Sequence, residues 1–586
     1  SYGRNTFGNG DHLMAGYIGS KAVSVNTTSA TISDDLTVGD DASVAGDLSV
    51  TGDYSSTTAG TSNLRLGVNA GNSIASGGNY NVCVGDEAGT AINTGDVNTF
   101  IGYQSGDATT TSGNNVGVGY ASLGTNIVSS KNVAIGNNAL KTHNLGSAGD
   151  GLNVAVGHGA GEEVSTGTVN TLIGGLAGNA LDVGAANVAV GYAALATEDG
   201  DGNNVAVGYL ALTTQNVGAD GHNTGVGHKA GRLITSGIRN TIVGALAGDA
   251  LTDADDNVAV GMLALSTCQL GSANTAVGKD ALEDCNPASA VTMYNSAFGQ
   301  GAAANLTTAI KGTFIGARSG GGASLTGNEN TCVGYDSGIG LTSGVQNTFV
   351  GSQAGDQNTD GSNNVAIGFQ TLGADSADDN VAVGVQALQA CTGGNNAALG
   401  PQAGLNATSA YNCTFLGHDA GVTGSPGGNH TGGHDEILFG NGAVSVANIQ
   451  VDWTVASDQR DKTDFTALDI GLDFIKALAP VTYKWDKRSK YGDKYADDYD
   501  LNEQTPDGTH KEDWLDVGFK AQEVEALEQA AGYNKSNKTN LVTSLTADGK
   551  QYGMQYSKFI PILVKAIQEQ NALIEALTAR IATLEG

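Results

Sequence analysis

The chain has 586 residues, enough for several domains, yet it contains 88 Gly, only 6 Pro and 6% aromatic residues. The glycines follow no three-residue period, which excludes collagen, and the many Val, Ala, Ile and Leu argue against disorder. A formal net charge of −32 excludes a basic nucleic-acid-binding face, and no apolar run approaches the roughly 18 residues of a membrane span, so we expect neither nucleic acid nor membrane insertion.

The chain begins at Ser1 rather than at Met, and we expect that an upstream attachment region is missing. Residues 1–62 contain segments such as Leu36–Asp40 and Leu48–Asp53, in which a similar pattern recurs every six residues. The pattern resembles the short β-helical stalk segments of phage fibres. Because six residues cannot enclose a core within one chain, we predict an intertwined stalk. Other tail proteins of the virion are the expected partners on this N-terminal side.

Residues 63–434 repeat the unit Asn-x-x-x-Gly-x-x-Ala-(Leu or Gly) with a spacing of about 17 residues. The second and fourth positions are Val, Thr or Ile, which predicts a short strand with one buried face. One such strand cannot bury its face alone, whereas stacked copies build a continuous core. The sequence therefore predicts a mainly β protein with a parallel β-solenoid, or β-roll. Side chains such as Val190 are expected to point into its core.

The repeat units also follow a second, longer period. The ninth position runs Gly, Gly, Leu, Leu, so that a super-period of four units recurs about every 70 residues. The third position is large and apolar once in each super-period, as Phe100, Leu172, Ile242 and Phe314. We interpret the rhythm as every fourth strand meeting a different environment, for example a neighbouring subunit.

The Asn that opens each copy has two interpretations, a sugar-binding position or a stacked amide ladder that satisfies the turn, and we favour the ladder. We place ligand specificity in loops that break the period, such as 141–152 and 283–294. The six Cys show no metal-ligand spacing, and we expect no metal or cofactor. Cys268 and Cys285 are one repeat apart and would lie on adjacent coils, as stacked thiols or as a disulfide.

The repeats also resemble the head repeats of trimeric autotransporter adhesins, which form parallel β-rolls. The unit here is longer than the usual one in that family, which implies an extra loop or another coil shape. A bacterial trimeric surface adhesin is therefore one alternative for the whole protein.

The composition changes after about residue 450, where all three Trp lie. Residues 435–456 form a connector, and 457–586 are predicted to be a small α+β domain with a helix over 467–479 and a strand over 481–485. Residues 559–585 carry a heptad pattern with one polar interruption, which predicts a parallel coiled coil. Its seam consists of Ile560, Leu563, Ile567, Ile574, Leu577, Ile581 and Leu584.

The hexapeptide 457–462 reads Ser-Asp-Gln-Arg-Asp-Lys and directly follows the connector. This part of the chain resembles the endosialidase-type intramolecular chaperone domain. The resemblance rests on the pattern Ser-Asp-x-Arg-x-Lys, the segment Gly518–Val524 and the terminal heptads. That family caps phage tail fibres and tailspikes, trimerises them and cuts itself off. The resemblance covers residues from about 435 to 586. It implies a homotrimer and a scissile bond between Ala456 and Ser457.

The resemblance also implies a serine–lysine dyad that acts once, with Ser457 as nucleophile and Lys462 as base. A serine hydroxyl is a weak nucleophile until a neighbour accepts its proton. Lysine accepts a proton only when neutral, so we expect burial at a subunit interface to lower its pKa. Asp461 would oppose this if its carboxylate met Lys462. The supporting motif residues are Asp458, Arg460, Gln522 and Glu523.

Together these features predict a trimeric phage tail fibre or tailspike, assembled in the host cytoplasm and carried by the virion. Its partner is a carbohydrate or protein receptor on the host surface. A tailspike depolymerase that hydrolyses surface polysaccharide is the other alternative, and this chemistry needs two carboxylates about 5 to 9.5 Å apart. The candidate carboxylates are Glu162 and Glu163, or Asp253, Asp255 and Asp256.

Overall fold

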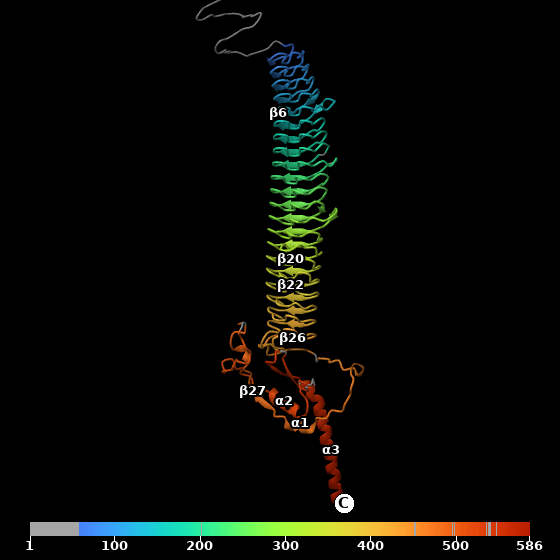
Figure 1. Ribbon diagram of the computed structural model, residues 1–586, viewed down its shortest axis with the longest axis vertical. Helices are drawn as coiled ribbons and strands as arrows, with labels where there is room; N and C mark the ends of the chain where they lie inside the picture. The colour runs from blue at the N-terminus through green and yellow to red at the C-terminus, as the bar shows by residue number, and fades with distance from the viewer. Residues whose placement is uncertain are drawn as a thin grey trace, which may run out of the picture. The chain divides into compact units, whose positions relative to one another are not determined.

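The computed structural model describes residues 58–586, except 201, 219, 451, 452, 495, 497, 535, 537, 538, 540 and 547. The predicted stalk, 1–62, therefore lies almost entirely outside the described residues. In the described part, 22 short strands form one parallel sheet along a stack of coils (Figure 1). The predicted parallel β-solenoid is confirmed.

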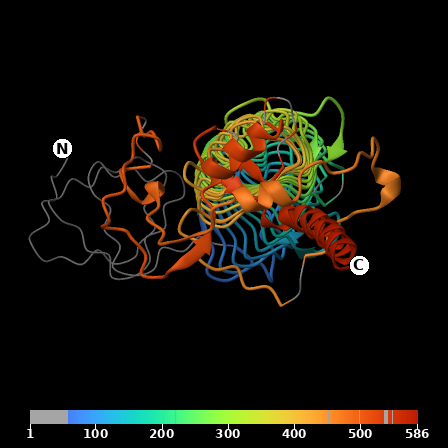
Figure 2. The ribbon, with the colours of Figure 1, turned by 90° about the horizontal axis from the view of Figure 1, so that it is seen from below.

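Each strand of the stack has three residues and pairs in parallel with the strand of the next coil, as Val188–Val190 does with Val205–Val207. In the end-on view the coils lie over one another (Figure 2). The strands are β1 (Leu64–Leu66), β2 (Val82–Val84), β3 (Thr99–Ile101), β4 (Val116–Val118), β6 (Val133–Ile135), β8 (Val154–Val156), β9 (Thr171–Ile173), β10 (Val188–Val190), β11 (Val205–Val207), β12 (Thr224–Val226), β13 (Thr241–Val243), β14 (Val258–Val260), β16 (Thr275–Val277), β18 (Ser296–Phe298), β19 (Thr313–Ile315), β20 (Thr331–Val333), β21 (Thr348–Val350), β22 (Val365–Ile367), β23 (Val381–Val383), β24 (Ala397–Leu399), β25 (Thr414–Leu416) and β26 (Ile437–Phe439).

Each of two longer coils carries one additional short strand, which pairs with a short strand of the preceding coil. β5 (Ser129–Ser130) pairs with β7 (Gly149–Asp150), and β15 (Gly271–Ser272) pairs with β17 (Val291–Thr292). The second strand of each pair lies inside a loop that the sequence marks as breaking the period, 141–152 or 283–294. These loops are therefore anchored to the stack by backbone pairing.

The strands face the core with their middle residue. Ala189 is fully buried, whereas Val188 and Val190 are half-buried, and a buried middle residue between two more exposed ones recurs in every strand of the stack after β1. The prediction that the second and fourth positions, Val190 among them, point into the core is wrong. A period of two reveals that a strand has two faces, but not which face is inside. The narrow coil admits mostly small middle residues, so the β-branched residues lie outside.

The super-period is a packing pattern inside this core. Phe100 is fully buried, and a Cβ atom added to Gly89 or Gly106 would lie 3.2 or 2.4 Å from its ring. Where the middle residue is Gly117, the ninth position is Leu123, which is fully buried. A large strand residue thus requires Gly in the turn, and a small one leaves room for Leu. The large third-position residues point into the chain's own core, so our interpretation of them as meeting a neighbouring subunit is wrong.

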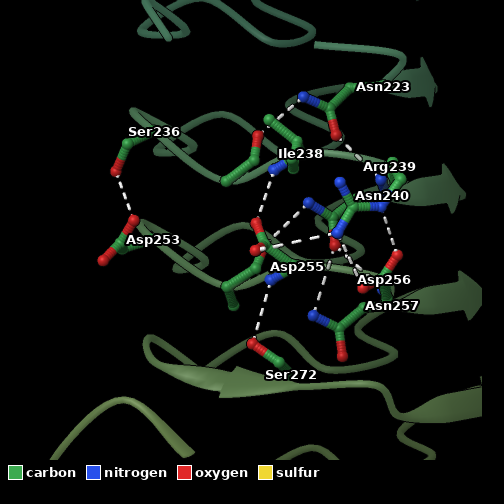
Figure 3. A network of polar contacts seen from close by, with 12 residues as sticks. Asn223, Ser236, Ile238, Arg239, Asn240, Asp253, Asp255, Asp256, Asn257 and Ser272 are labelled. Atoms are coloured by element: carbon green, nitrogen blue, oxygen red, sulfur yellow. Dashed lines mark hydrogen bonds and ion pairs between the residues drawn. The ribbon is translucent and has the colours of Figure 1, made fainter. Parts of the chain in front are cut away.

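The Asn that precedes the strand in most coils forms a buried amide ladder, as Figure 3 shows for three successive coils. The Oδ1 atom of Asn240 accepts a hydrogen bond from the backbone N–H of Asn257 at 3.0 Å, and its Nδ2 donates to the carbonyl of Ala254 at 2.8 Å. Its own backbone N–H donates to Oδ1 of Asn223 at 2.8 Å. Backbone groups in a dry core need such partners. The ladder interpretation is confirmed, and the sugar-binding one does not fit buried side chains.

The Gly that follows each strand is required by close stacking of the coils. Gly191 has a φ of +137°, and a Cβ atom there would lie 2.3 Å from the carbonyl oxygen of Gly208 in the next coil. Only Gly combines this conformation with such a close approach of two backbones.

Cys268 and Cys285 are free thiols, and their Sγ atoms lie 3.4 Å apart on adjacent coils. The stacked-thiol interpretation therefore holds, and the disulfide is absent. Met293 places its Sδ atom 3.3 Å from the Sγ atom of Cys285 and completes a buried group of three sulfur atoms.

The described residues of the C-terminal region form two small antiparallel sheets and three α-helices. β27 (Val481–Tyr483) pairs with β28 (Asp516–Gly518), and β29 (Thr543–Leu545) pairs with β30 (Tyr552–Met554). The helices are α1 (Leu472–Ala477), α2 (Ala521–Ala530) and α3 (Phe559–Glu585), with short 3-10 helices η1 (Gln459–Asp461), η2 (Arg488–Lys490) and η4 (Tyr556–Lys558). Their own core consists of Ile470, Phe474, Val524, Val542, Phe559 and Ile562.

The predicted helix over 467–479 is shorter in the structure, because α1 begins at Leu472 and ends at Ala477. Leu478 is already extended. Pro480 also disfavours a helical conformation at the residue before it, Ala479. The predicted strand and the predicted terminal helix are present as β27 and α3.

Candidate self-cleavage site

The predicted nucleophile and base lie at the two ends of the η1 turn. Asp458 caps this turn: its side chain accepts a hydrogen bond from the backbone N–H of Arg460 at 2.8 Å and forms an ion pair with the Arg460 guanidinium at 2.6 Å. The hydrogen bonds from Arg460 lower the pKa of the Asp458 carboxyl. The carboxylate is therefore kept ionised as the anchor of the turn.

The turn brings Lys462 back onto Ser457. The Nζ atom of Lys462 lies 2.5 Å from the Oγ atom of Ser457 and 3.5 Å from its carbonyl oxygen. A general base must lie within hydrogen-bonding distance of the proton it removes. The structure thus brings the two predicted residues together in the arrangement that proton transfer from the hydroxyl to a neutral amine requires.

The dyad is open to solvent in the single chain. Ala456, Ser457 and Lys462 are all exposed. Proton abstraction requires the neutral form of lysine, and burial is what favours that form. The geometry for proton transfer is therefore present within one chain, whereas the burial that would favour a neutral lysine is not.

Two features of the motif do not contact the dyad. Among the described residues, no ion pair joins Asp461 to Lys462, so the opposing contact considered from the sequence is not formed. Gln522 and Glu523 lie exposed on α2, where Glu523 pairs with Lys520 at 2.7 Å. A supporting role for these two residues stays a prediction.

Comparison with protein families places this site at the start of a known domain. Residues 457–533 match the family described as chaperone of endosialidase, and the match starts at Ser457. The combination of this match with a β-solenoid fits a tailspike or fibre with a C-terminal chaperone. No curated protein and no solved structure matches the chain.

The terminal helix α3 lies C-terminal to the matched segment, and its predicted seam is exposed. Phe559, Ile562 and Ala566 of α3 are buried against the domain. The seam residues on the other positions are between 43% and 78% exposed. They are Ile560, Leu563, Ile567, Ile574, Leu577, Ile581 and Leu584. A row of exposed Ile and Leu at heptad spacing is the surface that a parallel coiled coil buries.

Two carboxylates of the C-terminal region hold its elements together and were not singled out from the sequence. Glu528 of α2 is buried and accepts hydrogen bonds from the backbone N–H groups of Val542 at 2.5 Å and Thr543 at 3.2 Å. Glu569 of α3 accepts the backbone N–H of Leu472 at 2.7 Å, at the start of α1. Both act on segments distant in sequence, which a local pattern does not reveal.

The acidic residues considered for glycosidase chemistry are occupied by contacts between coils (Figure 3). Asp256 forms a bidentate pair with Arg239, at 2.6 and 2.9 Å, and this contact lowers the pKa of its carboxyl. Asp255 accepts the backbone N–H of Ile238 at 2.8 Å, and Asp253 accepts the hydroxyl of Ser236 at 2.6 Å. These contacts explain the cluster as a ladder between coils.

The other acidic pair has similar contacts. Glu162 accepts a hydrogen bond from the side-chain amide of Asn138 at 3.0 Å and lies 3.8 Å from the ammonium of Lys141, while Glu163 is exposed. Within the described residues, no group of three or more His, Cys, Asp or Glu could hold a metal ion. None of the helices in that part of the chain is long and apolar enough to cross a bilayer.

Proposed function

We propose that the chain is the subunit of a homotrimeric phage tail fibre or tailspike that removes its own C-terminal chaperone. In this proposal residues 1–62 are the stalk, 63–434 the shaft and receptor-binding region, 435–456 the connector and 457–586 the chaperone, with a coiled coil over 559–585. The observation that carries the proposal is the contact between Lys462 and Ser457, at the first residue of the segment that matches the chaperone family.

The cut follows from the position of the Ser457 hydroxyl next to its own peptide bond. The neutral amine of Lys462 removes the proton from Oγ, and Oγ attacks the carbonyl carbon of Ala456. The C–N bond then breaks, the proton passes to the departing amine of Ser457, and an ester joins the two residues. Water hydrolyses this ester. The products are a carboxylate at Ala456 and a free amino group and hydroxyl at Ser457.

Exposure of the dyad supports a cut that waits for assembly. A protonated lysine cannot act as a base, and in water lysine is protonated at neutral pH. Three chains closing around the η1 turn would remove water and favour the neutral amine. The exposed α3 seam provides the contact that brings parallel chains together. The mature shaft would then adhere to a host-surface carbohydrate or protein as part of the virion.

Expression of the wild-type chain, followed by mass spectrometry, tests the cut. We expect fragments that end at Ala456 and begin at Ser457. Ser457→Ala and Lys462→Ala should each remain full length. Lys476→Ala, which removes another exposed lysine of the same domain, should be cut like the wild type. Efficient cutting of both dyad variants would remove Ser457 and Lys462 from the mechanism.

A further inference from the structure

The outer face of the solenoid sheet is uncharged along its entire length, and most of its residues are apolar. Each of the 22 strands turns two flanking residues outward, and none of these residues is ionisable. They are Val, Ile, Leu, Phe, Ala, Thr and, once, Ser. Many are substantially exposed, such as Ile101 at 39% and Leu399 at 54%. On a chain with a net charge of −32, an uncharged column of this length is a distinct surface.

The area of this face is larger than that of the apolar patches that soluble monomers usually expose. Strands about 4.8 Å apart make a column of 22 strands about 100 Å long, and side chains two residues apart make it about 10 Å wide. The area is therefore about 1,000 Å², against about 300 to 600 Å² for the largest apolar patch of a typical monomer. Parallel sheets are also normally covered on both faces. A stable contact buries about 800 Å² on each partner, so this face is large enough for one.

Aromatic side chains lie beside this face. Tyr192 and Tyr209 follow the strand-ending Gly of their coils and stack at 5.7 Å between ring centroids, and Tyr103 and Tyr120 do the same. All four are about half exposed. Tyr is enriched at protein–protein contacts, where an apolar body and a polar end suit the border of a buried region.

A second copy of the chain is the occupant that fits this face. The partner must be straight, uncharged and apolar over about 100 Å, with a repeat of one strand spacing, and a parallel copy has these properties in the same register. The exposed α3 seam requires parallel copies as well. We propose that the outer sheet faces of three copies pack against one another around a common axis. This inference rests on the homotrimer of the proposed function.

Cysteine cross-linking of the full chain tests the contact. In a three-fold assembly, Val190→Cys and Val118→Cys place thiols on the face that approaches the axis, whereas Thr197→Cys and Thr125→Cys lie on exposed positions elsewhere on the same coils. The six native thiols are buried and do not compete. After oxidation with copper phenanthroline, we expect about two thirds of the chains to run as disulfide-linked dimers for the valine variants, because two of three thiols can pair. The threonine variants should stay unlinked.

Sedimentation of the same samples separates this inference from the proposed function. A trimer that cross-links at the valine positions alone supports the shared sheet face. A trimer in which neither valine variant cross-links, or in which the threonine variants cross-link equally well, overturns it and leaves the proposed trimer intact. A chain that sediments as a monomer overturns both. Two coils are tested because one variant alone could fail to fold.

Discussion

Large and small residues fill complementary volumes inside the coils. We therefore predict that the loss of stability caused by adding a methyl group at a turn Gly depends on the strand side chain that the methyl group meets. Gly106 has a φ of +60°, and a Cβ atom there would meet the ring of Phe100 at 2.4 Å. Gly146 has a φ of +72° and nothing within 4 Å of the same added atom. Substituting Ala at both positions therefore imposes a similar backbone strain, but only Gly106→Ala also forces the ring to move.

The expected magnitudes follow from these contacts. A left-handed conformation costs a non-Gly residue about 1 to 2 kcal/mol, which is the whole effect expected for Gly146→Ala. Gly106→Ala adds the overpacking of a filled core, typically about 1 to 3 kcal/mol more. Phe100→Ala alone should cost about 3 to 5 kcal/mol, because it leaves a cavity. In that background the added methyl has room, so Gly106→Ala should cost only the backbone strain.

Thermal unfolding of the purified protein, followed by circular dichroism at one scan rate, compares the four variants with the wild type. We expect Gly106→Ala to lower the unfolding temperature clearly more than Gly146→Ala does. We also expect the double variant Phe100→Ala/Gly106→Ala to lose less than the sum of its single changes. Equal losses for Gly106→Ala and Gly146→Ala, together with additive effects in the double variant, would refute this account of the super-period.

Further predictions concern the ladder, pH and the thiols. Asn240→Ala leaves the buried N–H of Asn257 without its acceptor and should destabilise the fold by about 1 to 3 kcal/mol, whereas the exposed Asn137→Ala should be nearly silent in the same unfolding assay. Burial lowers the pKa of His143 to about 4, so the unfolded chain binds a proton below about 6.5 while the folded chain does not. Stability should therefore fall by up to about 3 kcal/mol as pH drops from about 6.5 to 4, and His143→Gln should lose that slope when unfolding is compared at pH 7.5 and 5. All six Cys are buried, so a thiol reagent should find no reactive group until the protein is unfolded, and rapid labelling of the native protein would contradict this.

The repeat architecture was predictable because the sequence repeats at a fixed spacing. A short strand that recurs in every copy of the unit can bury one face only by stacking on its neighbours. The inward face was not. Hydrophobicity places Val190 inside and Ala189 outside, but the coil is too narrow for a row of β-branched side chains, and the structure reverses the two. The packing of Phe100 with Gly106 was hidden for a related reason: sequence spacing does not say which two positions of a coil meet across its core.

Only part of the candidate site was predictable from the sequence. The resemblance of the hexapeptide 457–462 to the chaperone family implied the pair of Ser457 and Lys462, and a single turn capped by Asp458 is enough to form it. The expected burial of the pair at a subunit interface stays a prediction, because both residues are exposed in the single chain. The same holds for the α3 seam, whose spacing identifies the helix face but not the number of chains that cover it.

The packing pattern of the core repeats every four coils. This repeat determines how many coils the shaft can gain or lose at a time. Removing the coil 153–169, which carries Gly161, would bring Leu140 of the preceding coil against Leu172 of the following one. Removing four coils would restore every large residue to its glycines, and it would shorten the column by about 19 Å. A series of variants that lose one, two, three or four coils should therefore pass from misfolded to native protein, with the fourth recovering the fold. Within residues 81–282, where the four-coil rhythm is kept, the shaft can therefore change its length without a mismatch only in whole super-periods.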